Sequence, residues 1–218
     1  MAKKLENNLL NMFLSLTVIC VVVGGLLGLV ASITEKPIQD AKNAAQNAAI
    51  AAVAPEFDAV AEPTTAAQAN GETATVFAVS NGGQVVGHAV QVTTLKGFGG
   101  KVVVMFGFDL EGNITGYSVL DCSNETPGLG AKMPEWFQKG QKGDVIGKNP
   151  AKNNLTVSKD GGEVDAITAA TISSRAFCDA IAQANSVLTG ADVATAASQQ
   201  VQEVAEAVEE AVEEVSIN

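Results

Sequence analysis

The pattern of apolar positions begins with one long uncharged stretch near the N-terminus. No charged residue lies between Glu6 and Glu35, and residues 12–33 are almost wholly apolar. As a helix this segment would extend roughly 33 Å, which is enough to cross a hydrocarbon core of about 30 Å. We therefore expect residues 1–34 to form an N-terminal tail and a transmembrane helix. The alternative is a cleaved signal peptide, whose apolar region is normally shorter, at about 7–15 residues.

The segment that follows is rich in alanine and then turns polar. Residues 38–54 favour a helix, with Pro37 suited to its first turn and Pro55 suited to end it. Residues 62–71 carry the polar and turn-forming residues of a connector rather than of a core element. We therefore expect residues 35–70 to form a helical stalk and a connector.

Apolar runs separated by turn residues then predict an antiparallel sheet. Asn81-Gly82-Gly83 is typical of a tight hairpin turn, and residues 111–113 form a second turn. The third strand is almost continuously apolar, so we expect it to be buried on both faces. His88 falls in the second strand, and we assign it no role. The predicted strands are residues 73–79, 84–95, 102–108 and 114–120.

Apolar spacing changes to that of a helix near residue 177. Phe177, Ile181, Ala184 and Leu188 recur at intervals of four, three and four, so they lie on one helical face. A serine three or four residues before Phe177, Ser174 or Ser173, is suited to cap the helix N-terminus. The whole pattern predicts an α+β fold, with one N-terminal transmembrane helix and an antiparallel sheet flanked by helices.

Charge and composition narrow the classes of function. The net charge of −11 argues against a nucleic-acid partner, which requires lysine and arginine for its phosphates. One histidine and the absence of a C-x-x-C pattern argue against a zinc or iron–sulfur site built by this chain alone. Six glutamates fall in the predicted C-terminal tail, residues 191–218, around valines at helical spacing. That tail is interpreted either as a mobile acidic segment or as a helix that docks on a neighbouring protein of the same assembly.

The start of the last predicted helix is the strongest candidate for chemistry. Thr171 stands just ahead of the predicted helix N-terminus, where free backbone N–H groups and the helix dipole favour a phosphate. Arg175 lies in the first turn, where the dipole disfavours a cation, so we interpret it as a partner for an anion.

These residues resemble a known motif. The sequence D-A-I-T-A-A-T-I-S-S at residues 165–174 is similar to the flavinylation motif of the FMN-binding domain in the G subunit of the Rnf electron-transport complex, a domain shared with the C subunit of the sodium-pumping NADH:quinone reductase. The family pattern is Asp-x-x-Ser/Thr-Gly-Ala-Thr-x-Ser/Thr, and its last threonine carries FMN through a phosphoester bond. The resemblance implies that Thr171 is this acceptor. Ala169 stands where the family has glycine. The other cofactor-binding residues implied are Asp165, Thr168, Ala169, Ala170, Ser173, Ser174 and Arg175.

A second motif lies about 40 residues earlier. Residues 125–130 read E-T-P-G-L-G, which is the family's sequence letter for letter. Its Pro-Gly pair fixes a turn, and its last glycine lets the backbone approach a flat ligand closely. The resemblance implies that this loop packs beside the isoalloxazine ring. The implied cofactor contacts are Glu125, Thr126, Gly128, Leu129, Gly130 and Lys132, the last facing negative charge on the reduced flavin.

Three nearby residues have two interpretations each. Trp136 either fills the core or lies beside the ligand. Cys122 and Cys178, each near one of the two motifs, either form a disulfide or remain free thiols.

The resemblance also implies a function. It makes residues 71–190 an FMN-binding domain on the periplasmic side of the bacterial inner membrane. The chain would be a single-pass redox subunit of an ion-translocating ferredoxin:NAD oxidoreductase (Rnf) complex, without a catalytic site of its own. Its partners would be the other subunits of that complex and the flavin transferase that attaches FMN.

Three other hypotheses remain. The first is the C subunit of the sodium-pumping reductase, although the Gly-Phe-Gly-Gly run at residues 97–100 and the shorter chain favour the Rnf type. The second is a membrane-tethered flavoprotein reductase outside any pump. The third is an assembly protein whose flavin motif has decayed.

Overall fold

A single long helix occupies the N-terminal part of the protein. The computed structural model describes residues 9–68 and 70–190, and the chain divides into two units between residues 46 and 47. Helix α1 spans Leu9–Val53 and is, within the described ranges, the one helix long and apolar enough to cross a membrane. The predicted acidic tail, residues 191–218, lies outside the described residues.

Helix α1 corrects one detail of the predicted stalk. Pro37 was expected in the first turn of a separate helix, but it lies inside α1, which is continuous around it. Proline lacks the N–H that would bond to the carbonyl four residues earlier, so α1 loses one backbone hydrogen bond there. The apolar and alanine-rich segments on either side favour helix strongly enough to tolerate that loss. The helix ends at Val53, two residues before Pro55, as predicted.

The sheet contains the four predicted strands, each slightly longer than expected. Its order is β1-β3-β4-β5-β6, all neighbours are antiparallel, and β2 pairs with β3 beside β1. Gly82 and Gly83 both have positive φ, 59° and 78°, which is the predicted two-residue turn between β3 and β4. The strands are β1 Ala59–Val60, β2 Thr64–Ala67, β3 Thr73–Asn81, β4 Gln84–Gly97, β5 Gly100–Asp109 and β6 Ile114–Asp121.

Strand β2 overturns the prediction that residues 62–71 form only a connector. Thr64 to Ala67 pair with Val76 to Thr73, so this polar segment completes the edge of β3. Its Thr-Thr-Ala-Ala sequence lacks the apolar alternation of a strand, and none of its four residues is fully buried. The next residue, Gln68, is buried and fixes the end of β2, since its Oε1 accepts a hydrogen bond from the Thr93 N–H at 3.1 Å.

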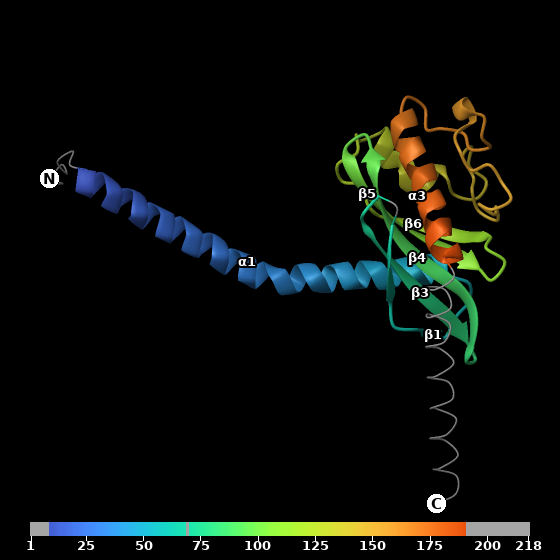
Figure 1. Cartoon of the computed structure of the whole chain (residues 1–218), viewed down its shortest axis with the longest axis horizontal. Helices are drawn as coiled ribbons and strands as arrows, with labels where there is room; N and C mark the ends of the chain where they lie inside the picture. The colour runs from blue at the N-terminus through green and yellow to red at the C-terminus, as the bar shows by residue number, and fades with distance from the viewer. Residues whose placement is uncertain (1–8, 69, 191–218) are drawn as a thin grey trace, which may run out of the picture. The chain divides into compact units, whose positions relative to one another are not determined.

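Helix α3 covers one face of the sheet (Figure 1). It spans Thr171–Thr189, and its buried face packs on the large core of the domain together with residues from β5, β6 and the short helix α2, Met133–Trp136. Strand β5 is buried on both faces over residues 102–108, as its apolar run predicted. Phe177 stacks on Phe137 with ring centroids 4.1 Å apart and meets Tyr117 edge-on at 4.9 Å. This aromatic cluster holds α3 against the sheet.

The opposite face of the sheet receives the last turns of α1. Ile50 and Val53 pack there in a smaller core with residues of β3, β4 and β5. Gly107 and Gly116 pair across β5 and β6, and a Cβ on Gly107 would overlap the carbonyl of Val53. The Thr115 hydroxyl donates to that same carbonyl at 2.6 Å. The missing side chains of these glycines therefore make room for the end of α1.

Polar contacts also anchor α3 to β4. Asp179 accepts hydrogen bonds from Thr94, Lys96 and Gln183. Burial alone would raise the pKa of Asp179, but these three hydrogen bonds and the Lys96 charge outweigh it, so the net pKa lies below its usual value. The carboxylate therefore stays ionised and fixes the middle of α3.

Candidate functional site

The two predicted motifs meet at one cavity. Its volume is about 310 Å³, and it lies between residues 125–130, here called the motif loop, and residues 169–173, here called the helix start. The tip of the β4–β5 hairpin forms a third side. The lining residues are Phe98, Thr126, Leu129, Gly130, Ala169, Ala170, Thr171, Ile172 and Ser173.

The motif loop contains the predicted turn. Pro127 and Gly128 occupy its centre, Gly128 has φ 78°, and the Leu129 N–H donates to the Thr126 carbonyl at 3.1 Å. A proline followed by a residue with positive φ, closed by this hydrogen bond, is the arrangement of a type II turn. Gly128 itself does not line the cavity.

Glu125 is buried beneath the cavity. It is 4% exposed, and both of its carboxylate oxygens are used within the protein. Oε1 accepts from the Gly99 N–H at 3.2 Å, and Oε2 accepts from the Ser173 hydroxyl at 2.6 Å. The sequence suggested that this side chain contacts the flavin. In the structure it joins three segments of the protein: the hairpin tip, the motif loop and the first turn of α3.

Glycines leave room for that carboxylate. A Cβ at Gly130 would overlap Glu125 Oε2 and lie 2.5 Å from the Ser173 hydroxyl oxygen. A Cβ at Gly97 would lie 2.5 Å from Glu125 Oε1, and a Cβ at Gly99 would overlap the Asn124 carbonyl. The sequence suggested that Gly130 allows a ligand to approach. Packing around Glu125 is a second reason for its missing side chain.

The helix start corrects the predicted cap. Helix α3 begins at Thr171, and its N-cap residue is Ala170, which has no side-chain cap hydrogen bond. Ser173 donates to Glu125, while the Ser174 hydroxyl donates to the Ala170 carbonyl and accepts from the Ile167 N–H. Both serines are therefore inside the helix and engaged elsewhere. Thr171 is the first helical residue rather than the residue before the helix.

Ala169 has an unusual backbone conformation. Its φ is 62°, and it is the one non-glycine residue with positive φ in the described part of the chain. A Cβ is disfavoured in this left-handed region, which glycine enters freely. This is the position where the related motif has glycine, so the conformation supplies a physical reason for that glycine.

Lys159 approaches the hydroxyl of Thr171 and was missed by sequence reasoning. Its Nζ lies 3.3 Å from Thr171 Oγ1. Lys159 belongs to a 3₁₀ turn, Ser158–Asp160, twelve residues before Thr171 in the sequence. The Lys-Asp-Gly-Gly sequence at residues 159–162 indicates a turn, but nothing in it indicates which residue the turn faces.

Arg175 forms an ion pair within the protein. Its Nε and one terminal nitrogen donate to the two carboxylate oxygens of Asp160 at 2.7 and 2.8 Å. These hydrogen bonds hold the pKa of Asp160 below its usual value. The anion that Arg175 serves in the structure is therefore a carboxylate of the same chain.

Three other predicted residues lie outside the cavity lining. Asp165, Thr168 and Lys132 are exposed. The Asp165 carbonyl accepts a hydrogen bond from the Trp136 indole N–H at 2.8 Å. Trp136 is partly buried against the core, so it fixes the segment that leads to the helix start.

The cavity has an apolar side, and of its three large side chains only Leu129 was predicted as a cofactor contact. Phe98 is 66% exposed at the tip of the hairpin, and Ile172 is 50% exposed in the first turn of α3. Together with Leu129 they place apolar side chains along the lining. Large apolar side chains exposed side by side at a cavity are typical of a binding site.

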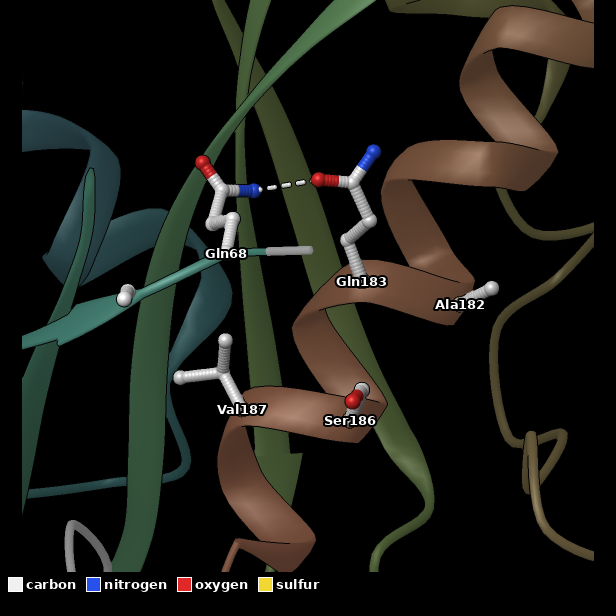
Figure 2. Close-up of a pocket in the computed structure, with 6 residues that line it drawn as sticks. Gln68, Ala182, Gln183, Ser186 and Val187 are labelled. Atoms are coloured by element: carbon white, nitrogen blue, oxygen red, sulfur yellow. Dashed lines mark hydrogen bonds between the residues drawn. The ribbon is translucent and has the colours of Figure 1, made fainter. Parts of the chain in front are cut away.

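A second cavity, lined by residues of α3 and of the end of β2, includes two side-chain amides in its lining (Figure 2). Figure 2 shows Gln68 and Gln183 pointing toward each other, with Gln68 Nε2 donating to Gln183 Oε1 at 2.7 Å. Gln183 in turn donates to Asp179 at 2.6 Å. These amides bond to one another and to α3. We therefore interpret the contacts as a structural link between the sheet edge and the helix.

The structure decides between the two interpretations of Cys122 and Cys178. Both are free thiols, so the disulfide is ruled out in this structure. Burial raises the pKa of Cys178 to about 12, and burial with the nearby charges of Asp121 and Glu125 raises the pKa of Cys122.

Comparison with known proteins places the chain in a family. The model of the FMN-binding domain matches residues 97–186, which include both motifs. The G subunit of the ion-translocating oxidoreductase complex of Yersinia pestis is 32% identical over 171 residues, covering 73% of this chain and 80% of the relative. The corresponding G subunit of Stutzerimonas stutzeri is 31% identical over 179 residues, covering 78% and 77%.

A third relative is similar over a shorter region. The G subunit of the Na⁺-translocating ferredoxin:NAD⁺ oxidoreductase complex of Acetobacterium woodii is 37% identical over 111 residues, which is 49% of this chain and 51% of the relative. The match therefore spans about half the length of that protein. From these similarities and from the shared cavity of the two motifs, we conclude that the chain belongs to the family of G subunits of ion-translocating oxidoreductase complexes and that residues 97–186 are its FMN-binding domain.

Proposed function

We propose that the chain carries FMN on Thr171 through a phosphoester and relays electrons within a membrane-bound ion-translocating oxidoreductase complex. One observation carries the proposal. The Thr171 hydroxyl lines the cavity at the N-terminus of α3, where the helix has no side-chain cap and a lysine ammonium lies 3.3 Å away.

The phosphate end of FMN fits the helix start. The first backbone hydrogen bond within α3 is donated by the Ser174 N–H to the Ala170 carbonyl, so the N–H groups of residues 171–173 precede the helical ladder. Alanine is among the poorest N-cap residues because it offers no acceptor to these donors. A phosphate on Thr171 would supply that acceptor, and the helix dipole would favour its negative charge.

The ring end of FMN fits the apolar side of the cavity. Phe98, Leu129 and Ile172 would contact the isoalloxazine and exclude water from part of it. Glu125 of the motif loop would hold these apolar side chains in place, because it is hydrogen-bonded to Gly99 of the hairpin tip and to Ser173 of the helix start. When bound, the flavin supplies one- and two-electron transfer, and the chain supplies position and electrostatics.

The role within a complex follows from the relatives. The relative in Acetobacterium woodii is named as part of a Na⁺-translocating ferredoxin:NAD⁺ oxidoreductase complex. We propose that this chain serves a complex of that kind, spans the membrane once through α1 and places its flavin domain on the periplasmic side. A flavin transferase would attach the cofactor. The chain would have no catalytic site of its own.

The alternative of a decayed flavin motif is weakened by one observation. Ala169 adopts the left-handed conformation that glycine favours, so the backbone keeps this shape despite the substitution. The alternative of a tethered reductase outside any pump is separated by isolation from native membranes. An assembly of several proteins that contains the chain supports the complex, and a solitary flavoprotein supports the tethered reductase.

The covalent bond is tested by gel fluorescence of a matched pair. The full chain is produced with a flavin transferase and run on a denaturing gel. We expect Thr171→Ala to lose the flavin fluorescence completely. Thr168→Ala, an exposed threonine of the same motif outside the cavity lining, should retain it. Full fluorescence of Thr171→Ala would show that the acceptor is another residue.

A further inference from the structure

We infer that Lys159 is the phosphate-positioning residue of this site: its ammonium group pairs with the FMN phosphate, and the Arg175–Asp160 ion pair holds it there. This inference rests on the proposed attachment at Thr171 and adds a residue that neither motif contains.

Lys159 contacts the acceptor hydroxyl directly. Its Nζ reaches the Thr171 hydroxyl at 3.3 Å although the lysine comes from a different segment of the chain. A phosphate bonded to Thr171 Oγ1 would carry its unesterified oxygens on the phosphorus, two bonds from Oγ1. The lysine side chain is long and flexible, so an ammonium that already lies within hydrogen-bond distance of Oγ1 can reach those oxygens. Charge-assisted hydrogen bonds of this kind are the stronger ones in proteins.

Lys159 is held in place by its neighbour. Asp160, the next residue, is bound through both carboxylate oxygens by Arg175 of α3. The turn that carries Lys159 is also fixed by its backbone. The Ser158 N–H donates to the Val164 carbonyl at 2.8 Å, and Gly161 ends the turn with a positive φ of 85°. The 3₁₀ turn is thus attached to the same first turn of α3 that presents Thr171.

The charges around the site leave Lys159 available for an anion. Asp160 neutralises Arg175, whereas none of the ion pairs between described residues involves Lys159. Neither Lys159 nor Lys132, the cation that the motif suggested, lines the cavity, but Lys159 contacts the hydroxyl of Thr171, which does line it. A phosphate esterified on both sides carries one negative charge, and Lys159 provides one positive charge beside it. Arg175, predicted to serve an anion directly, would then act by positioning Lys159.

The test separates phosphate recognition from folding. The full chain is produced without a flavin transferase, and its affinities for FMN and for riboflavin, which lacks the phosphate, are measured by quenching of flavin fluorescence. We expect Lys159→Met to reduce the ratio of the two affinities about fivefold while riboflavin affinity stays unchanged. Lys159→Arg, which keeps the charge, should restore most of the ratio. Lys152→Met, an exposed lysine of the same segment, should leave the ratio unchanged.

A second measurement uses the attachment reaction. Each variant is incubated with flavin transferase and its flavin donor, and covalent fluorescence on a denaturing gel is followed with time. Lys159→Met should incorporate flavin several-fold more slowly than Lys152→Met. An unchanged affinity ratio together with an unchanged rate would overturn the inference, as would an equal loss of FMN and riboflavin affinity. Absence of covalent flavin from the wild type would instead overturn the proposed function at Thr171.

Discussion

The two sides of the cavity are built in opposite ways. In the motif loop, the polar side chain Glu125 is buried and both of its oxygens are satisfied by the protein. At the helix start, Ala170 leaves the first turn uncapped, Ala169 has a conformation unfavourable for alanine, and Thr171 lines the cavity. The motif loop therefore contributes to the stability of the domain, whereas the helix start leaves N–H donors and a hydroxyl for a ligand. Substitutions on the two sides should therefore differ in sign and in what they affect.

The largest effect is expected at Gly130. An added Cβ would overlap the Glu125 carboxylate and crowd the Ser173 hydroxyl, so Gly130→Ala must displace backbone or break the hydrogen bonds between the two sides. We expect a loss of about 3 kcal/mol or more in the free energy of unfolding, measured by urea denaturation of the purified chain.

Gly128 provides the matched control for this prediction. It lies in the same loop and also has a positive φ, but nothing lies within 4 Å of the Cβ it would gain. Gly128→Ala should therefore cost only about 1 kcal/mol, which is the conformational term alone. Equal losses for the two variants would show that the buried carboxylate does not define the loop.

The next largest effect is expected at Glu125. Glu125→Gln keeps the shape of the side chain but replaces one acceptor oxygen with an amide donor, and both existing partners are donors. The Ser173 hydroxyl can rotate to accept instead, whereas the Gly99 N–H cannot. We expect a loss of about 1–2 kcal/mol in the free energy of unfolding. Because Glu125 does not line the cavity, the variant should still become flavinylated on a denaturing gel. Complete loss of attachment with unchanged stability would place Glu125 in the flavin site instead.

The same difference explains what could be predicted from the sequence. Local patterns gave the four strands, the hairpin turns and the turn of the motif loop, because each depends on residues adjacent in the chain. The N-cap was wrong because Ser173 is bound by Glu125, a residue 48 positions away. Strand β2 was missed because its pairing with β3, rather than its own apolar pattern, determines it.

In the candidate site, too, contacts between residues far apart in the sequence could not be predicted. The motifs identified two of the segments that line the cavity. Phe98 lines it from a hairpin, and Lys159 contacts Thr171 from a turn, and neither segment carries a signal of ligand contact. The use of Glu125 within the protein could not be predicted, since a glutamate in a loop is normally solvated. The packing of Gly97 and Gly130 against its carboxylate shows that this side chain is enclosed by the protein.

An effect that depends on pH concerns the thiol on each side of the cavity. Cys178 is buried on α3 and its pKa is raised to about 12, whereas Cys122 is partly exposed three residues before the motif loop. Above about pH 9 the unfolded chain releases the Cys178 proton while the folded chain retains it, so the unfolded state binds fewer protons and gains in relative stability. Between about pH 9 and 10.5, the free energy of unfolding should fall by about 1.4 kcal/mol per pH unit through this group.

The contribution of Cys178 is isolated by difference. Urea denaturation at several pH values compares the wild type with Cys178→Ala, so that the titration of other groups such as Tyr117 cancels. In Cys178→Ala the free energy of unfolding should fall less steeply above about pH 9, because the contribution of this thiol is gone. Cys122→Ala should change the slope less. Equal slopes in the wild type and Cys178→Ala would mean that α3 opens readily at its first turns.

The smallest effect has the opposite sign and is expected at Ala169. With φ at 62°, its Cβ is in the left-handed region, and the residue is exposed, so little packing compensates the strain. Ala169→Gly relieves that strain but adds flexibility to the unfolded chain, and the net gain should be about 0.5–1 kcal/mol in the free energy of unfolding. Ala176→Gly, in the interior of α3, should instead destabilise by about 1 kcal/mol or more. If Ala169→Gly raises the free energy of unfolding and leaves flavin attachment unchanged, the backbone conformation that the site requires is strained in the wild type. A loss there would show that the methyl group contributes contacts that outweigh the strain.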